Sequence, residues 1–243
     1  MLTINYKTIT MKQQPYLVFD GETSPLDLEE LEALAPPFEA AANLKDPAKI
    51  LASIAEKKQK WIDDAALSAQ SGKVLCIAIS ENGNRGVIDG EESAILAEFW
   101  SHLDSMKAEY AGAALFIGFN SNSFDVPFFV RRSWILGVQV PGWVRPNRYL
   151  NDCFVDLLDK WRMGDREAKT GGLNTLAKCF KVGEKNGSGK LFYKLWSEDR
   201  EAALAYALQD IALTEAIAMK MGVIQPISQE SVIHSDETDD FDY

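Results

Sequence analysis

The short stretch at residues 16–23 constrains this chain more than any other feature of its sequence. Four apolar residues follow Pro15 and run directly into Asp20 and Glu22, which is typical of a buried strand that ends at Gly21. Because side chains on a strand alternate between its faces, the two acids are expected to point the same way. Two carboxylates held together there repel each other unless a positive group lies between them, and a hard divalent cation is the usual one.

An isolated Asp-x-Glu pair also occurs where a strand ends in solvated acids, so the metal hypothesis depends on matching carboxylates elsewhere. Asp125 follows the apolar run 114–119 and precedes Pro127, where it either joins such a site or caps the following helix. Asp210 lies four residues after Tyr206, which places both side chains on one face of the last predicted helix. Taken alone, Asp210 is more typical of a helix surface.

Together these residues resemble the motifs of a known enzyme family, the DEDDy branch of the DnaQ-like 3'–5' exonucleases. Residues 20–23 resemble its first motif, residues 120–128 its second and residues 206–210 its third. The similarity is greatest to the predicted exonucleases related to the proofreading domain of B-family DNA polymerases. It covers residues 16–221, apart from the segments 24–72 and 185–196. The order of the motifs, and their placement on strand, strand-to-helix junction and helix, makes the set specific.

The chain departs from the family pattern at Gly21, where the family usually has a bulky apolar residue. A glycine there is expected to lose a packing contact and to loosen the strand, but it removes no metal ligand. The segment 24–72 is also longer than the family leads us to expect. It is rich in Leu, Ala, Glu and Lys, and a helix is predicted from Pro47 to about Ser68, with proline at the first helical position.

The order of the predicted elements indicates a mixed α/β sheet flanked by helices. Strands are expected at 74–79, 85–88 and 114–119, the first two joined as a hairpin. Helices are expected at 91–110, 126–136, 173–180 and 197–222, the last with Ser197 as its N-cap and Gly222 at its end, and 154–158 is a short helix or strand. The family resemblance implies that this architecture is the RNase H-like fold, with a helical insertion after the first core strand.

The chain is accordingly divided into three parts. Residues 1–15 are expected to form an N-terminal arm or an edge strand, and residues 16–222 the exonuclease domain, with the insertion at about 24–72. Residues 223–243 form an acidic tail that is expected to be disordered. This tail either docks a basic protein partner or only keeps the protein soluble.

The net charge of −11 at first argues against a nucleic-acid partner. However, the tail after Gly222 holds six acids and no Lys or Arg, so it carries −6 of that total. Several of the remaining acids are candidate metal ligands, whose charge a bound cation would offset. Net charge therefore counts only weakly against nucleic acid.

The cysteines and the hydropathy pattern indicate a cytoplasmic, reducing setting. Cys76, Cys153 and Cys179 are too far apart for a zinc or redox motif, and each is predicted to be a buried, reduced thiol. No apolar run reaches the roughly 18 residues of a membrane span, and residues 1–7 lack the layout of a signal peptide, so no membrane association is expected. The chain has only two histidines, which excludes chemistry built on several of them.

The family resemblance implies two divalent ions, Mg²⁺ or Mn²⁺, because phosphodiester hydrolysis needs an activated water and a stabilised leaving oxygen. By this resemblance, Asp20 would bridge both ions, while Glu22 and Asp210 would hold the ion that activates water. Asp125 would support the second ion. Tyr206 would orient the attacking water, since a phenol with an ordinary pKa of about 10 is a poor base at neutral pH.

Substrate contacts are expected next to these acids, from Gly21, Thr23, Asn120 and Phe124. Phe124 either stacks on a base or packs in the core. Six basic residues are candidates for phosphate contacts, although each is individually more typical of a solvated surface: Arg131, Arg132, Arg145, Arg148, Lys185 and Lys190. Four tryptophans are predicted to lie in the core: Trp61, Trp100, Trp134 and Trp161.

The sequence therefore favours a two-metal 3'–5' exonuclease that hydrolyses phosphodiester bonds at the 3' end of single-stranded DNA and releases nucleoside 5'-monophosphates. A 3'–5' exoribonuclease of the same fold is an alternative, because no motif reads the 2'-hydroxyl. A non-catalytic nucleic-acid-binding or partner-docking module is a second alternative. The presence of all four acids together with Tyr206 weighs against that module.

Overall fold

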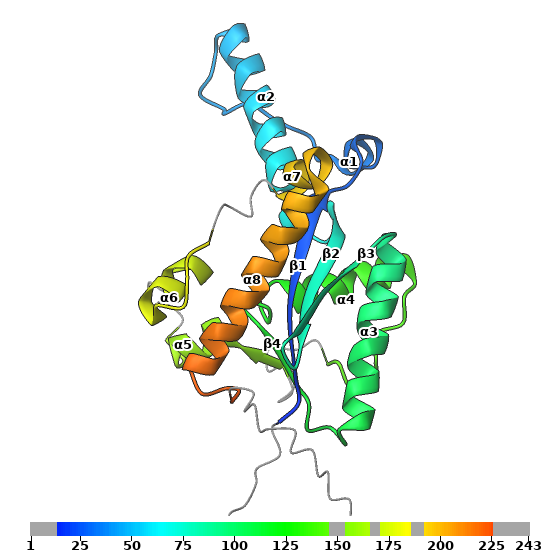
Figure 1. Ribbon diagram of the computed structural model, residues 1–243. Helices are drawn as coiled ribbons and strands as arrows, with labels where there is room; N and C mark the ends of the chain where they lie inside the picture. The colour runs from blue at the N-terminus through cyan, green and yellow to red at the C-terminus, as the bar shows by residue number, and fades with distance from the viewer. Residues whose placement is uncertain (1–13, 146–153, 166–170, 186–191, 226–243) are drawn as a thin grey trace, which may run out of the picture.

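The computed structural model describes residues 14–145, 154–165, 171–185 and 192–225. In this part of the chain the strands form one mixed sheet in the order β3-β2-β1-β4-β5 (Figure 1). The central strand β1 covers Tyr16–Pro25, and β2 (Gly72–Glu81) and β3 (Asn84–Asp89) follow it as antiparallel neighbours on one side. On the other side, β4 (Leu115–Gly118) and β5 (Phe154–Asp156) run parallel to it.

The two faces of β1 are covered by different helices. Leu17 and Phe19 pack against α3 (Glu92–Glu109) and α4 (Asp125–Leu136), whereas Tyr16 and Val18 pack against α8 (Arg200–Lys220). Figure 1 shows α8 lying across the sheet along β1. This arrangement confirms the predicted α/β fold class. Because side chains alternate, the next residues on the α8 face are Asp20 and Glu22.

Three shorter helices pack on the same side of the sheet as α8. They are α5 (Leu157–Arg162), α6 (Leu173–Phe180) and α7 (Phe192–Glu198). The segment predicted as a short helix or strand contains both, since β5 leads directly into α5. Among the described helices, α8 alone is long and apolar enough to cross a membrane, but 56% of its most apolar window is buried inside the fold. Packing against the sheet accounts for this composition.

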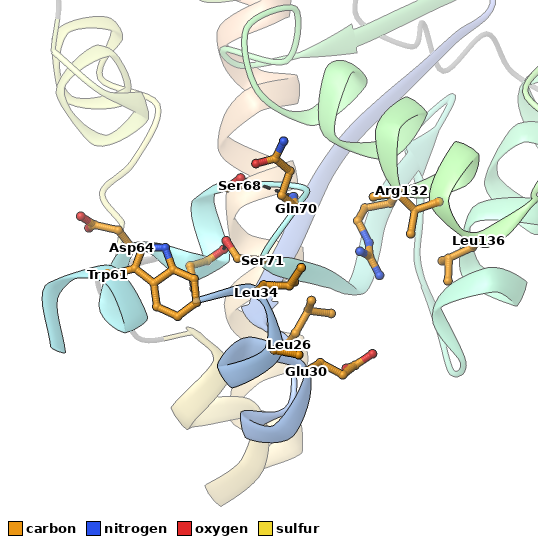
Figure 2. Close-up of a pocket in the computed structure, with 13 residues that line it drawn as sticks. Leu26, Glu30, Leu34, Trp61, Asp64, Ser68, Gln70, Ser71, Arg132 and Leu136 are labelled. Carbon is orange, nitrogen blue, oxygen red and sulfur yellow. Dashed lines mark hydrogen bonds between the residues drawn. The ribbon is translucent and has the colours of Figure 1, made fainter. Parts of the chain in front are cut away.

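The predicted helical insertion follows β1. It contains α1 (Leu28–Leu34), α2 (Pro47–Asp64) and the 3₁₀ turn η1 (Ala65–Leu67). Helix α2 has no buried residue, and Figure 1 shows it extending away from the sheet. A cavity of about 970 Å³ lies between the base of the insertion and the end of α4 (Figure 2). The insertion therefore adds a separate hollow surface beyond the sheet.

Two element boundaries differ from the sequence-based expectation. Strand β1 does not end at Gly21 but continues to Pro25, because the backbone of this half stays paired with β2, with one shift of register between Glu22 and Thr23. The last helix does not begin at Ser197, which lies inside α7. Asp199 is the N-cap of α8 instead, since its carboxylate accepts a hydrogen bond from the Ala202 N–H at 3.0 Å.

Two predictions about buried residues are wrong. Trp134 is 63% exposed and Trp161 is 43% exposed, so neither belongs to the core, whereas Trp100 is buried and bonded to Ser133. Cys179 is exposed on α6, while Cys76 is buried as expected. Residues 1–13 of the predicted arm 1–15, residues 226–243 of the predicted tail 223–243, Cys153, Arg148 and Lys190 lie outside the described residues. The start of the predicted disordered tail is packed instead, because Ile224 is buried in the core on the α8 side of the sheet.

Candidate metal centre

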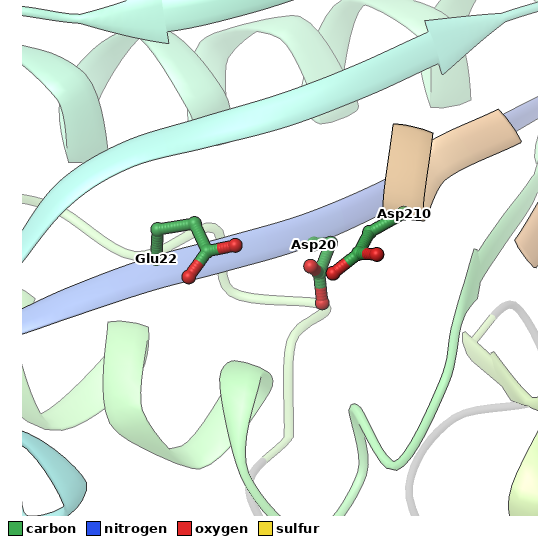
Figure 3. A group of neighbouring side chains, drawn as sticks. All are labelled: Asp20, Glu22 and Asp210. Carbon is green, nitrogen blue, oxygen red and sulfur yellow. The ribbon is translucent and has the colours of Figure 1, made fainter. Parts of the chain in front are cut away.

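Three of the predicted ligands meet on the α8 face of the sheet. Asp20 and Glu22 come from β1 and Asp210 comes from α8, and one carboxylate oxygen from each lies within 4.8 Å of the others (Figure 3). The period-two alternation of β1 brings its two acids to this face, where α8 packs on Tyr16 and Val18. Glu22 and Asp210 are almost fully buried. The described residues therefore form an acidic cluster, here called the acidic trio, that could hold a metal ion.

The electrostatics of the acidic trio favour a bound cation. Burial, followed by the charge of Asp210, raises the pKa of Asp20 to about 7. Burial and the charge of Asp20 likewise raise the pKa of Glu22 well above its ordinary value, and burial raises the pKa of Asp210. A raised pKa means that each carboxylate resists ionisation unless positive charge compensates it. The buried Oδ1 of Asp210 has no hydrogen-bond partner among the described residues, which leaves a ligand atom available.

Lys185 supplies part of that positive charge. Its Nζ forms an ion pair with Asp210 Oδ2 and lies 4.7 Å from the centre of the Tyr206 ring, with its side chain only 18% exposed. Burial opposes the charge of this ammonium, but hydrogen bonding to Asp210 raises the pKa of Lys185 above its ordinary value. The chain therefore places its own cation against the acidic trio.

The loop that carries Lys185 is fixed from two sides. The backbone N–H of Lys185 donates to Asn174 Oδ1 at 2.9 Å, and Gln209 Nε2 donates to the carbonyl of Glu184 at 3.0 Å. Sequence reasoning placed Lys185 among six phosphate-contact candidates and favoured a solvated surface for each. No local pattern distinguishes it, because its position depends on where this loop meets α6 and α8.

Asp125 lies beside the acidic trio but outside it. Its Oδ1 accepts a hydrogen bond from the Gly21 N–H at 3.0 Å, so one oxygen is tied to the backbone of β1 between the two β1 acids. Asp125 is the first residue of α4 and not its cap, because Phe124 occupies the N-cap position. Burial, then the charge of Asp20, raises the pKa of Asp125 well above its ordinary value. The structure thus brings Asp125 against the β1 acids from the α4 side.

Tyr206 lies one helical turn before Asp210 and is mostly buried. Burial is the main cause that raises its pKa to about 12, while Lys185 acts in the opposite direction. The phenol therefore keeps its proton at neutral pH, as the sequence argument assumed for a residue that orients water. It lies beneath the Lys185 ammonium on the same side of α8 as the acidic trio.

A cavity of about 420 Å³ adjoins the acidic trio, and Asn120 and Arg162 line it together with Asp20, Lys185 and Asp210. Asn120 has a left-handed backbone, with φ of +62°, and its N–H donates to Asp156 Oδ1 at 2.9 Å. The buried Asp156 also accepts hydrogen bonds from the backbone N–H groups of Asn122 and Leu158. Asp156 therefore holds the loop after β4 in place and caps α5. The family resemblance extends to Asp156 and Leu157, but it assigns Asp156 no role, and the contacts with the loop after β4 have no local signal in the sequence.

The other predicted substrate residues are less available. The Thr23 hydroxyl donates to the Ala66 carbonyl at 2.8 Å, which ties it to the insertion. Phe124 is half-buried and packs on Phe128, with ring centres 5.5 Å apart. Arg132 is buried and forms an ion pair with Glu92 at 2.6 Å, so its charge is compensated within the protein. Arg131 and Arg145 are exposed.

No protein-family model matches the chain, and no curated protein matches it. Among solved structures, the chain is similar to the family B DNA polymerase from the hyperthermophilic archaeon Pyrobaculum calidifontis, with a TM-score of 0.55 and 20% sequence identity. The match covers 86% of this chain but 25% of the polymerase chain, so this chain spans about a quarter of its neighbour's length. At this identity the likeness shows the fold alone, and that fold is consistent with the expected RNase H-like architecture.

Proposed function

We propose that this protein is a metal-dependent 3'–5' exonuclease of the DEDDy type that removes nucleotides from the 3' end of single-stranded DNA. The observation that carries this proposal is the acidic trio, in which Asp20, Glu22 and Asp210 converge from β1 and α8. Three carboxylates with raised pKa values and a free Asp210 oxygen suit Mg²⁺ or Mn²⁺, which prefer oxygen ligands. The polymerase-like fold supports a nucleic-acid substrate.

In this proposal the acidic trio holds divalent ions, with Asp125 supporting a second ion from the α4 side. When bound, such ions supply the positive charge that activates a water molecule and stabilises the leaving 3'-oxygen. Tyr206, which stays protonated, orients that water through its hydroxyl. Asp125 also fixes the β1 backbone against α4, because its carboxylate accepts a hydrogen bond from the Gly21 N–H.

The cavity of about 420 Å³ receives the terminal nucleotide beside the acidic trio. Lys185 and Arg162 line this cavity and offer positive charge to the phosphate. Asn120, held by Asp156, presents its side chain at the cavity wall. Thr23 acts through the insertion instead of touching substrate, because its hydroxyl bonds to Ala66.

The test is digestion of a 5'-labelled single-stranded DNA oligonucleotide with Mg²⁺ or Mn²⁺, beside an RNA of the same sequence. We expect a ladder that shortens from the 3' end, with nucleoside 5'-monophosphates as products. EDTA and Asp210→Ala should each abolish it, whereas Glu98→Ala, which removes an exposed acid on α3, should not. A ladder on RNA alone would assign the same site to an exoribonuclease. No cleavage by folded protein that binds Mn²⁺ would leave a non-catalytic binding module.

A further inference from the structure

A hollow, largely apolar surface is formed where the insertion meets α4. The cavity of about 970 Å³ there is lined by apolar side chains from α1, α2, η1, α4 and the residue that follows β1 (Figure 2). We call it the insertion groove, and its apolar lining comprises Leu26, Leu34, Trp61, Ala65, Ile135 and Leu136. Leu34 is 52% exposed and Ile135 is 58% exposed, so the apolar surface extends to the rim. Apolar surface left open in this way is typical of an interaction site.

The charged side chains that lack a partner in the insertion groove are acidic. Glu30 and Asp64 line it, and neither has a basic partner among the described residues. The one cation in its lining, Arg132, is buried in a two-pronged pair with Glu92, with Nε–Oε1 at 2.9 Å and Nη2–Oε2 at 2.6 Å. The groove therefore presents uncompensated negative charge around an apolar floor.

The same imbalance continues into an adjoining cavity of about 430 Å³, which shares Leu26, Glu30 and Leu136 with the groove. Its two further cations are also paired, Lys73 with Asp27 at 2.8 Å and Arg200 with Asp89 at 2.6 Å. Every basic residue along this path is thus compensated within the chain. An occupant that carries positive charge would complement the carboxylates that remain.

Charge disfavours two classes of occupant. Nucleic-acid phosphates would meet unpaired carboxylates at Glu30 and Asp64, which repel them. A second copy of the chain is disfavoured because each copy carries a net charge of −11. A partner with apolar side chains flanked by Lys or Arg matches both the floor and the rim.

We propose that the insertion groove binds a short basic, amphipathic helix of a partner protein. Its apolar face packs on Leu34, Ile135 and Leu136, in the helix-in-groove mode. One basic side chain extends to Trp61 and Asp64, which are three residues apart on α2 and lie side by side in Figure 2. An aromatic face and a carboxylate together suit a Lys or Arg side chain.

The insertion groove lies next to the strand that carries the acidic trio. Leu26 directly follows β1, and Thr23 on β1 bonds to η1, whose Ala65 lines the groove. A partner bound there would therefore contact the protein next to the end of its central strand. This binding does not depend on nuclease activity, so the two proposals can fail separately.

The test uses the full chain and a fluorescein-labelled, 14-residue model helix made of Leu and Lys, with binding followed by fluorescence anisotropy. Two matched peptides serve as comparisons, one with Glu in place of each Lys and one with Ser in place of each Leu. We expect the Leu/Lys peptide to bind at least tenfold more tightly than either. Equal binding of the Ser/Lys peptide would show that charge alone acts, and it would overturn the proposal.

Charge reversal then locates the site. The double variant Glu30→Lys, Asp64→Lys should weaken the Leu/Lys peptide at least tenfold, and Ile135→Ser should weaken it severalfold. The control Glu56→Lys, Glu98→Lys changes the net charge equally at exposed positions outside the groove lining, and it should change affinity less than threefold. Equal losses in the two double variants would overturn the proposal. Two other results would also overturn it. One is binding of a labelled thymidine oligonucleotide that Ile135→Ser weakens severalfold, and the other is dimerisation of the chain that Ile135→Ser abolishes.

Discussion

At the scale of single residues, Lys185 is the most informative side chain of the candidate metal centre. Its ammonium pairs with Asp210 in the acidic trio, where it compensates one negative charge. In the proposed function, a divalent ion would bind Asp210 through Oδ1, which has no hydrogen-bond partner among the described residues, but it would be repelled by this ammonium and would displace it from Oδ2. Once displaced, the ammonium is free to meet a phosphate in the adjoining cavity. The proposed function therefore gives Lys185 two roles, in which it opposes metal binding and supports substrate binding.

This dual role predicts opposite changes in two measurements for Lys185→Met. Mn²⁺ affinity, measured by isothermal titration calorimetry, should rise by about tenfold or more, because a nearby positive charge is removed. Nuclease kcat should fall by roughly 100-fold, because a charged group near the phosphate is lost. Lys185→Arg, which keeps the charge, is the control and should leave Mn²⁺ affinity within a few fold. Weaker Mn²⁺ binding by Lys185→Met would show that Lys185 only organises the acids.

Gly21 has a packing role that its sequence context does not reveal. It faces α4, and a Cβ atom at this position would overlap the Phe129 ring. That ring belongs to a buried aromatic cluster with Phe19 and Phe99. The expected loss of a packing contact at Gly21 is therefore wrong, because Phe129 fills the space that a larger residue would take.

Gly21→Ala should lower the free energy of unfolding by about 1–3 kcal/mol, since the Phe129 ring is packed too tightly to move freely. Urea denaturation would measure this loss. The matched control is Gly86→Ala on β3, where a Cβ would meet nothing within 4 Å, and it should be close to neutral. Adding Phe129→Leu to Gly21→Ala should cost less than the sum of the two single changes. Simple additivity would contradict the predicted overlap.

At the scale of elements, α8 is anchored to three strands by one buried carboxylate. Glu215 Oε1 accepts hydrogen bonds from the Tyr16 hydroxyl on β1 at 3.1 Å and from the Ser80 hydroxyl on β2 at 2.8 Å. Its Oε2 pairs with Arg85 on β3 at 2.7 Å. Glu215 lies five positions after Asp210 on the same helix, so this network fixes the helix that delivers Asp210 to β1.

Glu215→Ala should destabilise the protein by roughly 3 kcal/mol, because two buried hydroxyls lose their acceptor together. Tyr16→Phe, which removes one donor only, should cost about 1 kcal/mol. The midpoint of urea unfolding reports both losses, and Glu98→Ala on exposed α3 surface should stay within about 0.5 kcal/mol of wild type. A loss for Glu215→Ala no larger than that control would mean that α8 is held by apolar packing alone.

The elements also show what the sequence can and cannot predict. The alternation on β1 and the four-residue spacing of Tyr206 and Asp210 are local patterns, so the facing acids and the helix that carries Asp210 could be predicted. The cap of α8 was misplaced because Ser197 and Asp199 are both suitable and only the fold selects one. The contacts of Lys185 with Asp210, and of Gly21 with Phe129, join distant segments. Neither has a local signature.

At the scale of the whole molecule, the cluster of buried acids imposes a cost on the metal-free fold. The pKa of Asp20 lies at about 7 in the folded protein, above its ordinary value of 3.8. The unfolded chain therefore releases this proton at lower pH than the folded chain does. Stability is highest below about pH 4 for this group and is lost as the pH rises towards 7, where the folded protein must also ionise.

Metal binding should reverse this loss, which gives a prediction for thermal unfolding. In EDTA at pH 8, Asp20→Asn should unfold at a temperature at least about 5 °C above wild type, because it removes the buried charge. At pH 4.5 the two should nearly coincide, since Asp20 is then protonated in the folded state. Excess Mn²⁺ at pH 8 should raise the unfolding temperature of wild type and not that of Asp20→Asn, because cation binding favours the ionised carboxylates. The contrary outcome is that Asp20→Asn is less stable than wild type in EDTA at pH 8. That result would mean that Lys185 alone compensates the charge of the acidic trio. The fold would then need no metal ion for its stability.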